Sequence, residues 1–292
     1  MADAGSQEIA VQISQFTTDA IGYSHPMTWV VGASSVTGHG LMASDVRITF
    51  GDGTELDLLR KSYRVGPYIL AGFAGSVEIG LHLIGGLQEF LNVPDIPDNF
   101  AWQPDWVAQN WFPKAAKLFE AAPSAEQDCG SQILMVGVSP DENMGVPGFQ
   151  RVYVTKLSWP DFTPQHMPKG LSVCHIGSGA GVEQYEAGIA DFFKFGSSAM
   201  MAGMRGGPGG WAQMIGSSIG RIVSESPVPG ISPHVFVDTV ALGSFWSGTN
   251  DKNTYHPDGR KVEFRMPEVA STYADFVALC RKLGKAAGRA IA

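Results

Sequence analysis

Hydrophobic positions along the chain fall into short runs rich in β-branched and aromatic residues, which predict strands. Two such runs, at 28–34 and 39–48, flank a short turn, and a third, at 61–75, predicts a hairpin that turns at Gly66 and Pro67. Between them, the segment 51–57 (GDGTELD) has the composition of a loop. Further strands are predicted at 131–139, 149–158, 171–179, 234–242 and 245–248.

A helical pattern follows the hairpin. Apolar residues recur at the spacing of one helix face over 76–91, where Ser76 is the expected N-cap. Prolines between 94 and 104 indicate a linker, and the Gly-rich stretch 203–210 (GMRGGPGG) indicates a flexible connection between helices. Further helices are predicted at 105–121, 181–194, 209–225 and 270–288.

The order of these elements predicts the fold class. Strands, two helices, strands, two helices, strands and a final helix follow one another along the chain. Hairpin-linked strands with clustered helices favour an α+β sandwich over a parallel βαβ sheet. The 292 residues contain no obvious linker between two cores, so one domain is expected over 28–292. Residues 1–27 are expected to form an N-terminal extension or propeptide.

Composition narrows the functional classes. The net charge of −8 argues against nucleic acid or an anionic membrane as partner. The chain has no run of about 18 apolar residues, and its first residues lack the basic and apolar regions of a secretory signal. The three cysteines have no metal-type spacing, and they favour a reducing compartment. We therefore expect a cytoplasmic protein that does not cross a membrane and needs no metal.

Several positions beside turns or at the ends of predicted strands carry polar side chains or glycine. They are Thr28, Asp45 and Arg47 in SDVR, Lys61 in LLRK, Gly75 in AGFAGS and Ser178 in IGSG. Taken singly, each has an ordinary structural interpretation, such as a turn residue, a solvated lysine or a tight strand-to-helix turn. Their order and spacing together are far more specific than any one of them.

In order and spacing, these residues resemble the pattern of the proteasome β-subunit superfamily, the N-terminal-nucleophile (Ntn) hydrolases. The resemblance covers residues 28–91 and extends more loosely as far as Ser178. The stretch around 27–47 is similar to that of bacterial proteasome homologues, including the ancestral-β-subunit type. The resemblance implies a four-layer αββα sandwich of two antiparallel sheets flanked by helices. It also implies a homo-oligomeric ring or helical stack, peptide or unfolded protein as substrate, an ATPase unfoldase as a candidate partner, and no organic cofactor.

The resemblance gives five of these residues a role. Thr28 would be the nucleophile of a threonine protease once it is the first residue of the mature chain, with its own α-amine as general base. A free α-amine has a pKa of about 7.7–8.0, and a nearby Lys61 ammonium would favour its uncharged form. Asp45 would hold Lys61 charged and oriented. The Gly75 N–H would stabilise the oxyanion, and Ser178 would contact the amine.

Two positions depart from the family pattern. The acid that the family carries before its Ser-Gly-Gly falls on Pro229 in PGISPHV, where Ser232 aligns with the family's serine. Either His234 compensates in part, or the site is inactive. Met27 stands where autolytic processing prefers glycine. If translation begins at Met27, removal of this methionine exposes Thr28 directly, and sequencing of the native protein should read Thr-Trp-Val-Val.

Two other functions stay open beside the expected peptide hydrolysis through an acyl-Thr28 ester. One is a structural, catalytically silent subunit whose N-terminal extension remains attached and blocks Thr28. The other is an Ntn amidase that acts on a small-molecule amide. The resemblance places Ile48, Leu59, Tyr63 and Phe73 in the wall of the side-chain pocket, and the simpler interpretation of these four residues is core packing.

Overall fold

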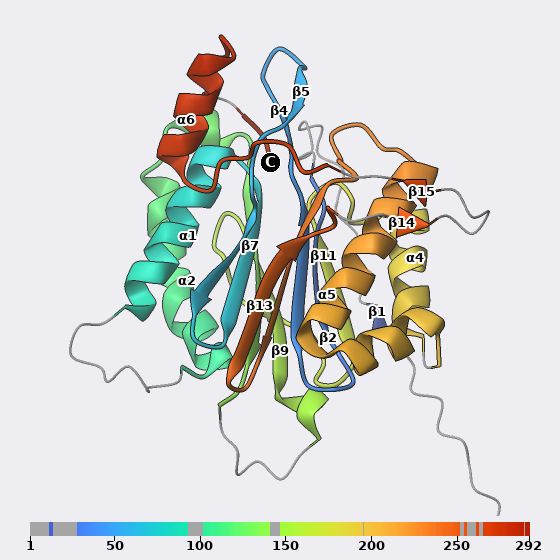
Figure 1. Cartoon of the computed structure of the whole chain (residues 1–292). Coiled ribbons are helices and arrows are strands. Elements are labelled where there is room, and N and C mark those ends of the chain that lie inside the picture. The colour runs from blue at the N-terminus through green and yellow to red at the C-terminus, as the bar shows by residue number, and fades with distance from the viewer. Residues whose placement is uncertain are drawn as a thin grey trace, which may run out of the picture.

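The computed structural model describes residues 12–13, 28–92, 102–140, 147–194, 196–251, 254–255, 261–262, 265–288 and 290–292. Within these ranges the chain is a mixed α+β protein with two large sheets (Figure 1). Apart from a short strand at 12–13, the expected extension 1–27 lies outside the described residues. The prolines of the expected linker at positions 94 and 97 lie outside them too.

The strands form two large sheets and two short pairs. The first sheet has the order β1 (Gln12–Ile13), β11 (Ser172–Ile176), β2 (Val30–Ser34), β3 (Gly40–Asp45), β12 (Val235–Ala241) and β13 (Ser244–Thr249). The second has the order β10 (Gln165–His166), β9 (Val152–Ser158), β8 (Ser131–Val138), β7 (Ile69–Gly75) and β6 (Ser62–Gly66). Neighbours are antiparallel, except that β1 is parallel to β11. The short pairs are β4 (Arg47–Thr49) with β5 (Glu55–Asp57), and β14 (Thr254–Tyr255) with β15 (Lys261–Val262).

The helices lie outside the sheets. They are α1 (Val77–Leu91), α2 (Pro104–Glu120), α3 (Ser124–Gln127), α4 (Glu183–Phe193), α5 (Ser198–Glu225) and α6 (Tyr273–Lys282), with a 3₁₀ helix at Gly148–Arg151. As predicted, Ser76 caps α1, because its side chain accepts a hydrogen bond from the N–H of Ile79. None of the described helices combines the length and apolar character needed to cross a membrane.

The two sheets face each other across an inner core of aliphatic side chains. This core includes Val30 and Met42 from the first sheet and Leu70, Leu134 and Val154 from the second. Each sheet also carries helices on its other face, and strands β2, β3 and β7 are therefore buried along their whole length. Apart from polar residues at the ends of β2 and β3, their sequences consist of apolar residues and glycine, because neither face of these strands meets water.

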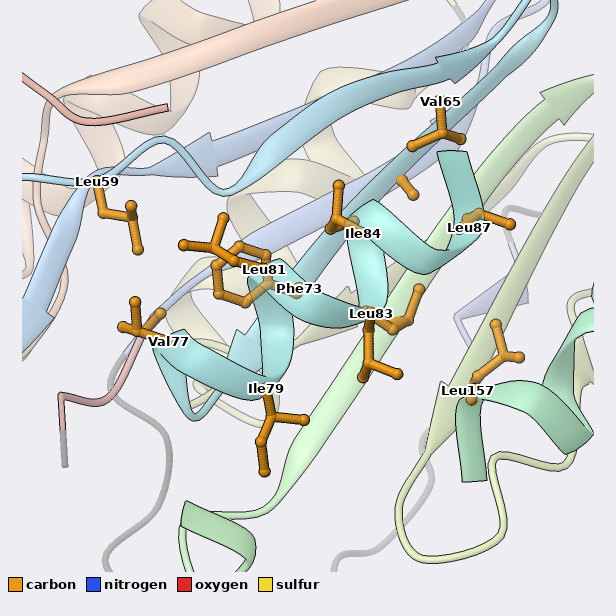
Figure 2. Close-up of a cluster of buried hydrophobic side chains, with 14 of the residues drawn as sticks. Leu59, Val65, Phe73, Val77, Ile79, Leu81, Leu83, Ile84, Leu87 and Leu157 are labelled. Carbon is orange, nitrogen blue, oxygen red and sulfur yellow. The ribbon is translucent and has the colours of Figure 1, made fainter. Parts of the chain in front are cut away.

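Two further cores lie between the sheets and the helices. Helices α1 and α2 cover the second sheet, and α4 and α5 cover the first (Figure 1). Under α1, the side chains of Val77, Leu81 and Ile84 lie around Phe73 of β7 (Figure 2). Gly80 allows this close packing, because a Cβ atom at that position would lie 2.0 Å from the Phe73 ring. The predicted face of this helix is thus the buried one.

The loop expected at 51–57 is wrong, because these residues form the turn and second strand of the β4–β5 hairpin. Arg47 pairs with Asp57 and Thr49 with Glu55. Gly53 has a φ of +79°, a conformation that glycine adopts without strain at the turn. The turn residues dominate the composition of this segment and hide the short strand that follows them.

The boundaries of three helices also differ from the sequence prediction. The Gly-rich stretch 203–210 belongs to α5, which is kinked where Gly207 has φ 59° and ψ −150° beside Pro208. Pro104 begins α2 instead of lying in a linker, because the first helical turn has N–H groups without helical partners and tolerates proline. Helix α6 ends at Lys282, earlier than the expected 288.

Candidate active site

The candidate residues meet at one end of the two sheets. Thr28 precedes β2, Asp45 ends β3, and Lys61 directly precedes β6. Because β2 and β3 are antiparallel neighbours, the start of one lies beside the end of the other, and the Asp45 N–H donates to the Trp29 carbonyl at 3.1 Å. Lys61 reaches the same place from the second sheet.

Thr28, Asp45 and Lys61 form a buried hydrogen-bonded triad. The Thr28 Oγ1 donates to Asp45 Oδ1 at 2.5 Å, and Lys61 Nζ lies 2.9 Å from the same oxygen. Lys61 Nζ also donates to Thr28 Oγ1 and to the carbonyl of Arg47. All three triad side chains are fully buried. The Thr28 hydroxyl therefore lies between a carboxylate and an amino group, and bulk water does not compete for these hydrogen bonds.

Burial of Lys61 and its pairing with Asp45 change the pKa of the lysine in opposite directions. Burial lowers the pKa of Lys61, and the charge and hydrogen bond of Asp45 oppose that change. Asp45 also accepts hydrogen bonds from the backbone N–H groups of Trp29 (2.9 Å), Arg47 (3.0 Å) and Ser232 (3.2 Å). The carboxylate is thus held in one orientation by backbone donors as well as by the lysine.

Ser178 lies against the main chain of Thr28. The Thr28 N–H donates to Ser178 Oγ at 3.1 Å, and Ser178 Oγ lies 3.3 Å from the Thr28 carbonyl oxygen. The N–H of Gly179 donates to that carbonyl at 3.0 Å. Gly177, with φ +81°, permits the approach, because a Cβ atom there would lie 2.4 Å from the Thr28 carbonyl oxygen. The turn after β11 therefore fixes the nitrogen of Thr28.

The carboxylate beside Ser232 comes from Asp57 of β5 rather than from the position of Pro229. Ser232 Oγ donates to Asp57 Oδ2 at 2.7 Å, and His234 Nδ1 lies 2.8 Å from the same oxygen. Arg47 Nε donates to Asp57 Oδ1 at 2.8 Å. Burial would raise the pKa of Asp57, but the hydrogen bonds from His234, Arg47 and Ser232 outweigh burial and lower the pKa below its ordinary value.

Asp57 was not predicted as a site residue, because its segment has the composition of a loop. The available signal was the alternation of Leu56 and Leu58 with Glu55 and Asp57, which is typical of a strand. Asp57 does not touch Thr28 in the described contacts. It holds Arg47 and Ser232, the two residues whose N–H groups donate to Asp45 Oδ2, so we interpret it as a positioning residue for the triad.

Gly75 ends β7 in a conformation that glycine alone adopts easily. Its φ is +109°, and a Cβ atom there would lie 2.4 Å from the carbonyl oxygen of Gly130. Its N–H, the predicted oxyanion donor, donates to the carbonyl oxygen of Ala292 at 2.7 Å. The donor is therefore already occupied by a main-chain oxygen of the same chain.

The residues expected to line a side-chain pocket pack in the core under α1. Ile48, Leu59 and Phe73 are fully buried in one hydrophobic cluster, and Tyr63 packs against it with its hydroxyl donating to the Arg60 carbonyl at 2.5 Å. Figure 2 shows Leu59 and Phe73 near the first turns of α1. Core packing is therefore their observed role.

Among the residues that the structure describes, His, Cys, Asp and Glu form no group of three or more that could hold a metal ion. Neither the models of known protein families nor the curated proteins include a match to this chain. The function has to be argued from the site itself.

Proposed function

We propose that this chain is a proteasome-like Ntn hydrolase in which Thr28 cleaves peptide bonds. The observation that carries the proposal is the buried contact of the Thr28 hydroxyl with both Asp45 and Lys61. Residues far apart in the sequence and named from one family pattern meet at one point. Two facing sheets with helices on both outer faces are the arrangement expected of the four-layer αββα sandwich.

The proposed reaction begins when Thr28 is the first residue of the chain. Its free amine removes the Oγ1 proton, and Oγ1 adds to the carbonyl carbon of a peptide bond. The Gly75 N–H stabilises the resulting oxyanion, a contribution of about 10²–10³ in rate for one such donor. The protonated amine then gives its proton to the departing nitrogen, and water cleaves the Thr28 ester.

Lys61 and Asp45 prepare the nucleophile in this scheme. The Lys61 ammonium disfavours a second positive charge on the Thr28 amine and so favours its basic form. Asp45 keeps the lysine and the hydroxyl in place. Ser178, which lies on the Thr28 nitrogen, orients the amine.

Release of residues 1–27 is a necessary step of the proposal. While they are attached, the Thr28 nitrogen is an amide that donates to Ser178 and has no basic lone pair. The proposal includes the start at Met27, or removal of a leader, as the source of the free amine. Retention of the leader would make the chain the silent structural subunit.

Hydrolysis of a peptide library tests the reaction. A chain that begins at Thr28 is expected to cleave peptides. Its Thr28→Ala variant should cleave them at least about 10³-fold more slowly, because no nucleophile remains. Thr28→Ser is the matched control that keeps a hydroxyl and should retain measurable cleavage. Mass spectrometry of the products is the readout, with unfolding curves to show that both variants fold.

Other outcomes of the digest would separate the alternatives. Full activity of Thr28→Ala would contradict the mechanism. Cleavage of small amides but of no peptide would indicate the amidase. A homo-oligomeric ring or stack, supplied by an ATPase unfoldase in the cytoplasm, belongs to the same proposal and rests on the family resemblance.

A further inference from the structure

The segment 290–292 lies between β4 and the junction of β7 with α1. Thr49 and Ile291 exchange both backbone hydrogen bonds, each at 2.9 Å. Gly75 and Ala292 also exchange both, each at 2.7 Å. In Figure 1 the end marked C lies between β7 and the β4–β5 hairpin. The segment is therefore bonded on both sides, as a strand is inside a sheet.

The pairing continues onto the first turn of α1. The N–H of Val77 donates to the carbonyl of Ala290 at 3.0 Å, and Ile291 forms antiparallel bridges with both Thr49 and Ser76. The first N–H groups of a helix have no partner within the helix, so the segment satisfies a donor that would otherwise need water. This is the main-chain bonding by which sheet edges bind extended peptides.

The register of the segment relates it to the proposed chemistry. Ala292 places its carbonyl oxygen on the Gly75 N–H, the donor assigned to the oxyanion. In the proposed reaction this N–H has to receive the substrate carbonyl, so Ala292 occupies a donor that the substrate needs. The side chains of Ala292 and Ala290 are buried in the hydrophobic cluster under α1, whereas Ile291 is half-buried.

Lys285 anchors the chain between α6 and the segment 290–292. Lys285 Nζ donates to Asp52 Oδ2 at 2.7 Å and to Thr54 Oγ1 at 2.8 Å, both in the turn of the β4–β5 hairpin. This contact lowers the pKa of Asp52. The chain that follows α6 thus contacts the β4–β5 hairpin through a side chain. Its backbone bonds both β4 and the junction of β7 with α1.

We infer that residues 290–292 are a resident ligand of the strip between Thr49 and Gly75–Val77, where the proposed function would place an extended substrate, and that they compete with that substrate. The backbone bonds do not depend on sequence, so another extended peptide can replace the segment. The burial of Ala292 limits the residue at that position to a small one. The catalytic consequence of this competition rests on the proposed function, whereas the binding does not.

Peptide binding tests the inference without turnover. The probe is fluorescein-labelled GRAIA, the sequence of 288–292, added to a Thr28→Ala chain with or without residues 290–292. The shortened chain should bind the probe saturably, and the full chain at least about tenfold more weakly, because a tethered competitor acts at high effective concentration. The control peptide GRAPA lacks the N–H that bonds Thr49 and should bind weakly. Equal binding of GRAIA by both chains, or none by a folded shortened chain, would overturn the inference.

Point variants decide the matter if the shortened chain does not fold. Ile291→Pro removes the N–H donated to Thr49, and Ile291→Ala keeps it while removing most of the half-buried side chain. In a chain that starts at Thr28, Ile291→Pro should lower the KM for a short peptide several-fold relative to Ile291→Ala, with kcat little changed. The same KM in both would count against competition by the segment.

The two arms also separate the inference from the proposed function. Probe binding by the shortened chain, together with no hydrolysis by any variant, would leave the peptide-binding strip standing and remove the enzyme. Hydrolysis that depends on Thr28 but is unaffected by Ile291→Pro, with no difference in probe binding, would leave the enzyme standing and remove the resident ligand.

Discussion

At the scale of single residues, the stability of the buried triad depends on how many hydrogen-bond and ion-pair partners each charged group has. Asp45 has three backbone N–H donors besides Thr28 and Lys61, whereas Lys61 has Asp45 as the one carboxylate within ion-pair distance among the described residues. Loss of the carboxylate therefore leaves a desolvated amino group without a counter-charge. Loss of the lysine leaves a carboxylate that is still hydrogen-bonded.

This asymmetry predicts different costs for two variants. Asp45→Asn should lower the free energy of unfolding by about 3–5 kcal/mol, because it leaves a buried charge unpaired. Lys61→Met fills a similar volume, removes a buried charge and should cost less than half as much. Urea unfolding at neutral pH measures both. A larger loss for Lys61→Met would contradict this account of the triad.

Asp57 predicts a pH dependence of stability. Its pKa is lower in the folded chain than the ordinary value of about 3.9 for an unfolded one. The stabilisation is therefore fully present above about pH 3.9 and is lost as the pH falls toward the folded-state pKa. Asp57→Asn should be less stable by about 2 kcal/mol at pH 7, since hydrogen bonds to a charged group are lost.

The difference in unfolding free energy between Asp57→Asn and the unchanged chain should be smaller at pH 3 than at pH 7. Equal differences at both pH values would show that Asp57 does not act through its charge. Because Asp57 is a positioning residue, Asp57→Asn should lower kcat more than it changes KM in a chain that begins at Thr28. Asp57→Glu should retain more of the rate than Asp57→Asn.

The sequence allowed the triad and two of its neighbours, Ser178 and Ser232, to be named, but not Asp57. Thr28, Asp45 and Lys61 were named from a resemblance in order and spacing, and the structure brings their side chains together. Asp57 belongs to no such pattern in this sequence, and its position depends on the pairing of β5 with β4. Residues whose role depends on pairing of this kind are hidden until the neighbouring strand is known.

At the scale of elements, α1 could be predicted because periodicity and capping agree. Its predicted span of 76–91 matches the observed Val77–Leu91 with Ser76 as cap. The β4–β5 hairpin and the kinked α5 could not, because glycine-rich composition outweighed the pattern of the flanking residues. The segment 290–292 has no pattern of its own and owes its conformation to the edges on either side.

The cap of α1 supports a prediction at this scale. Ser76 Oγ accepts from the Ile79 N–H and donates to the buried Glu126 at 2.6 Å. Ser76→Ala should therefore cost about 1–2 kcal/mol of unfolding free energy. Thr272→Ala is the matched control, because Thr272 caps α6 at an exposed site and should cost less. An equal cost, measured by urea unfolding, would mean that burial of the Ser76 cap adds nothing.

At the scale of the whole molecule, the two sheets bring together residues that are distant in the chain. Thr28 and Ser178 are 150 positions apart, and Asp57 and His234 are 177 positions apart, yet each pair is in hydrogen-bond contact. Because β2 is antiparallel to both β3 and β11, the start of β2 lies at the same end of the first sheet as the ends of β3 and β11. The contact of Ser178 with Thr28 was expected from the family resemblance, whereas the linear patterns of the sequence left the contact of Asp57 with His234 open.

The proposed enzyme makes one demand on the whole chain, which is that Thr28 must carry a free amine beside its hydroxyl. A peptide epoxyketone tests this demand most directly, because stable coupling needs both groups of one N-terminal threonine. Intact mass and peptide mapping should find one probe on Thr28 of a chain that begins there. No probe should be found on the Thr28→Ala variant or on the chain that retains residues 1–27. An unlabelled chain that begins at Thr28, or a probe attached at any other residue, would contradict the account.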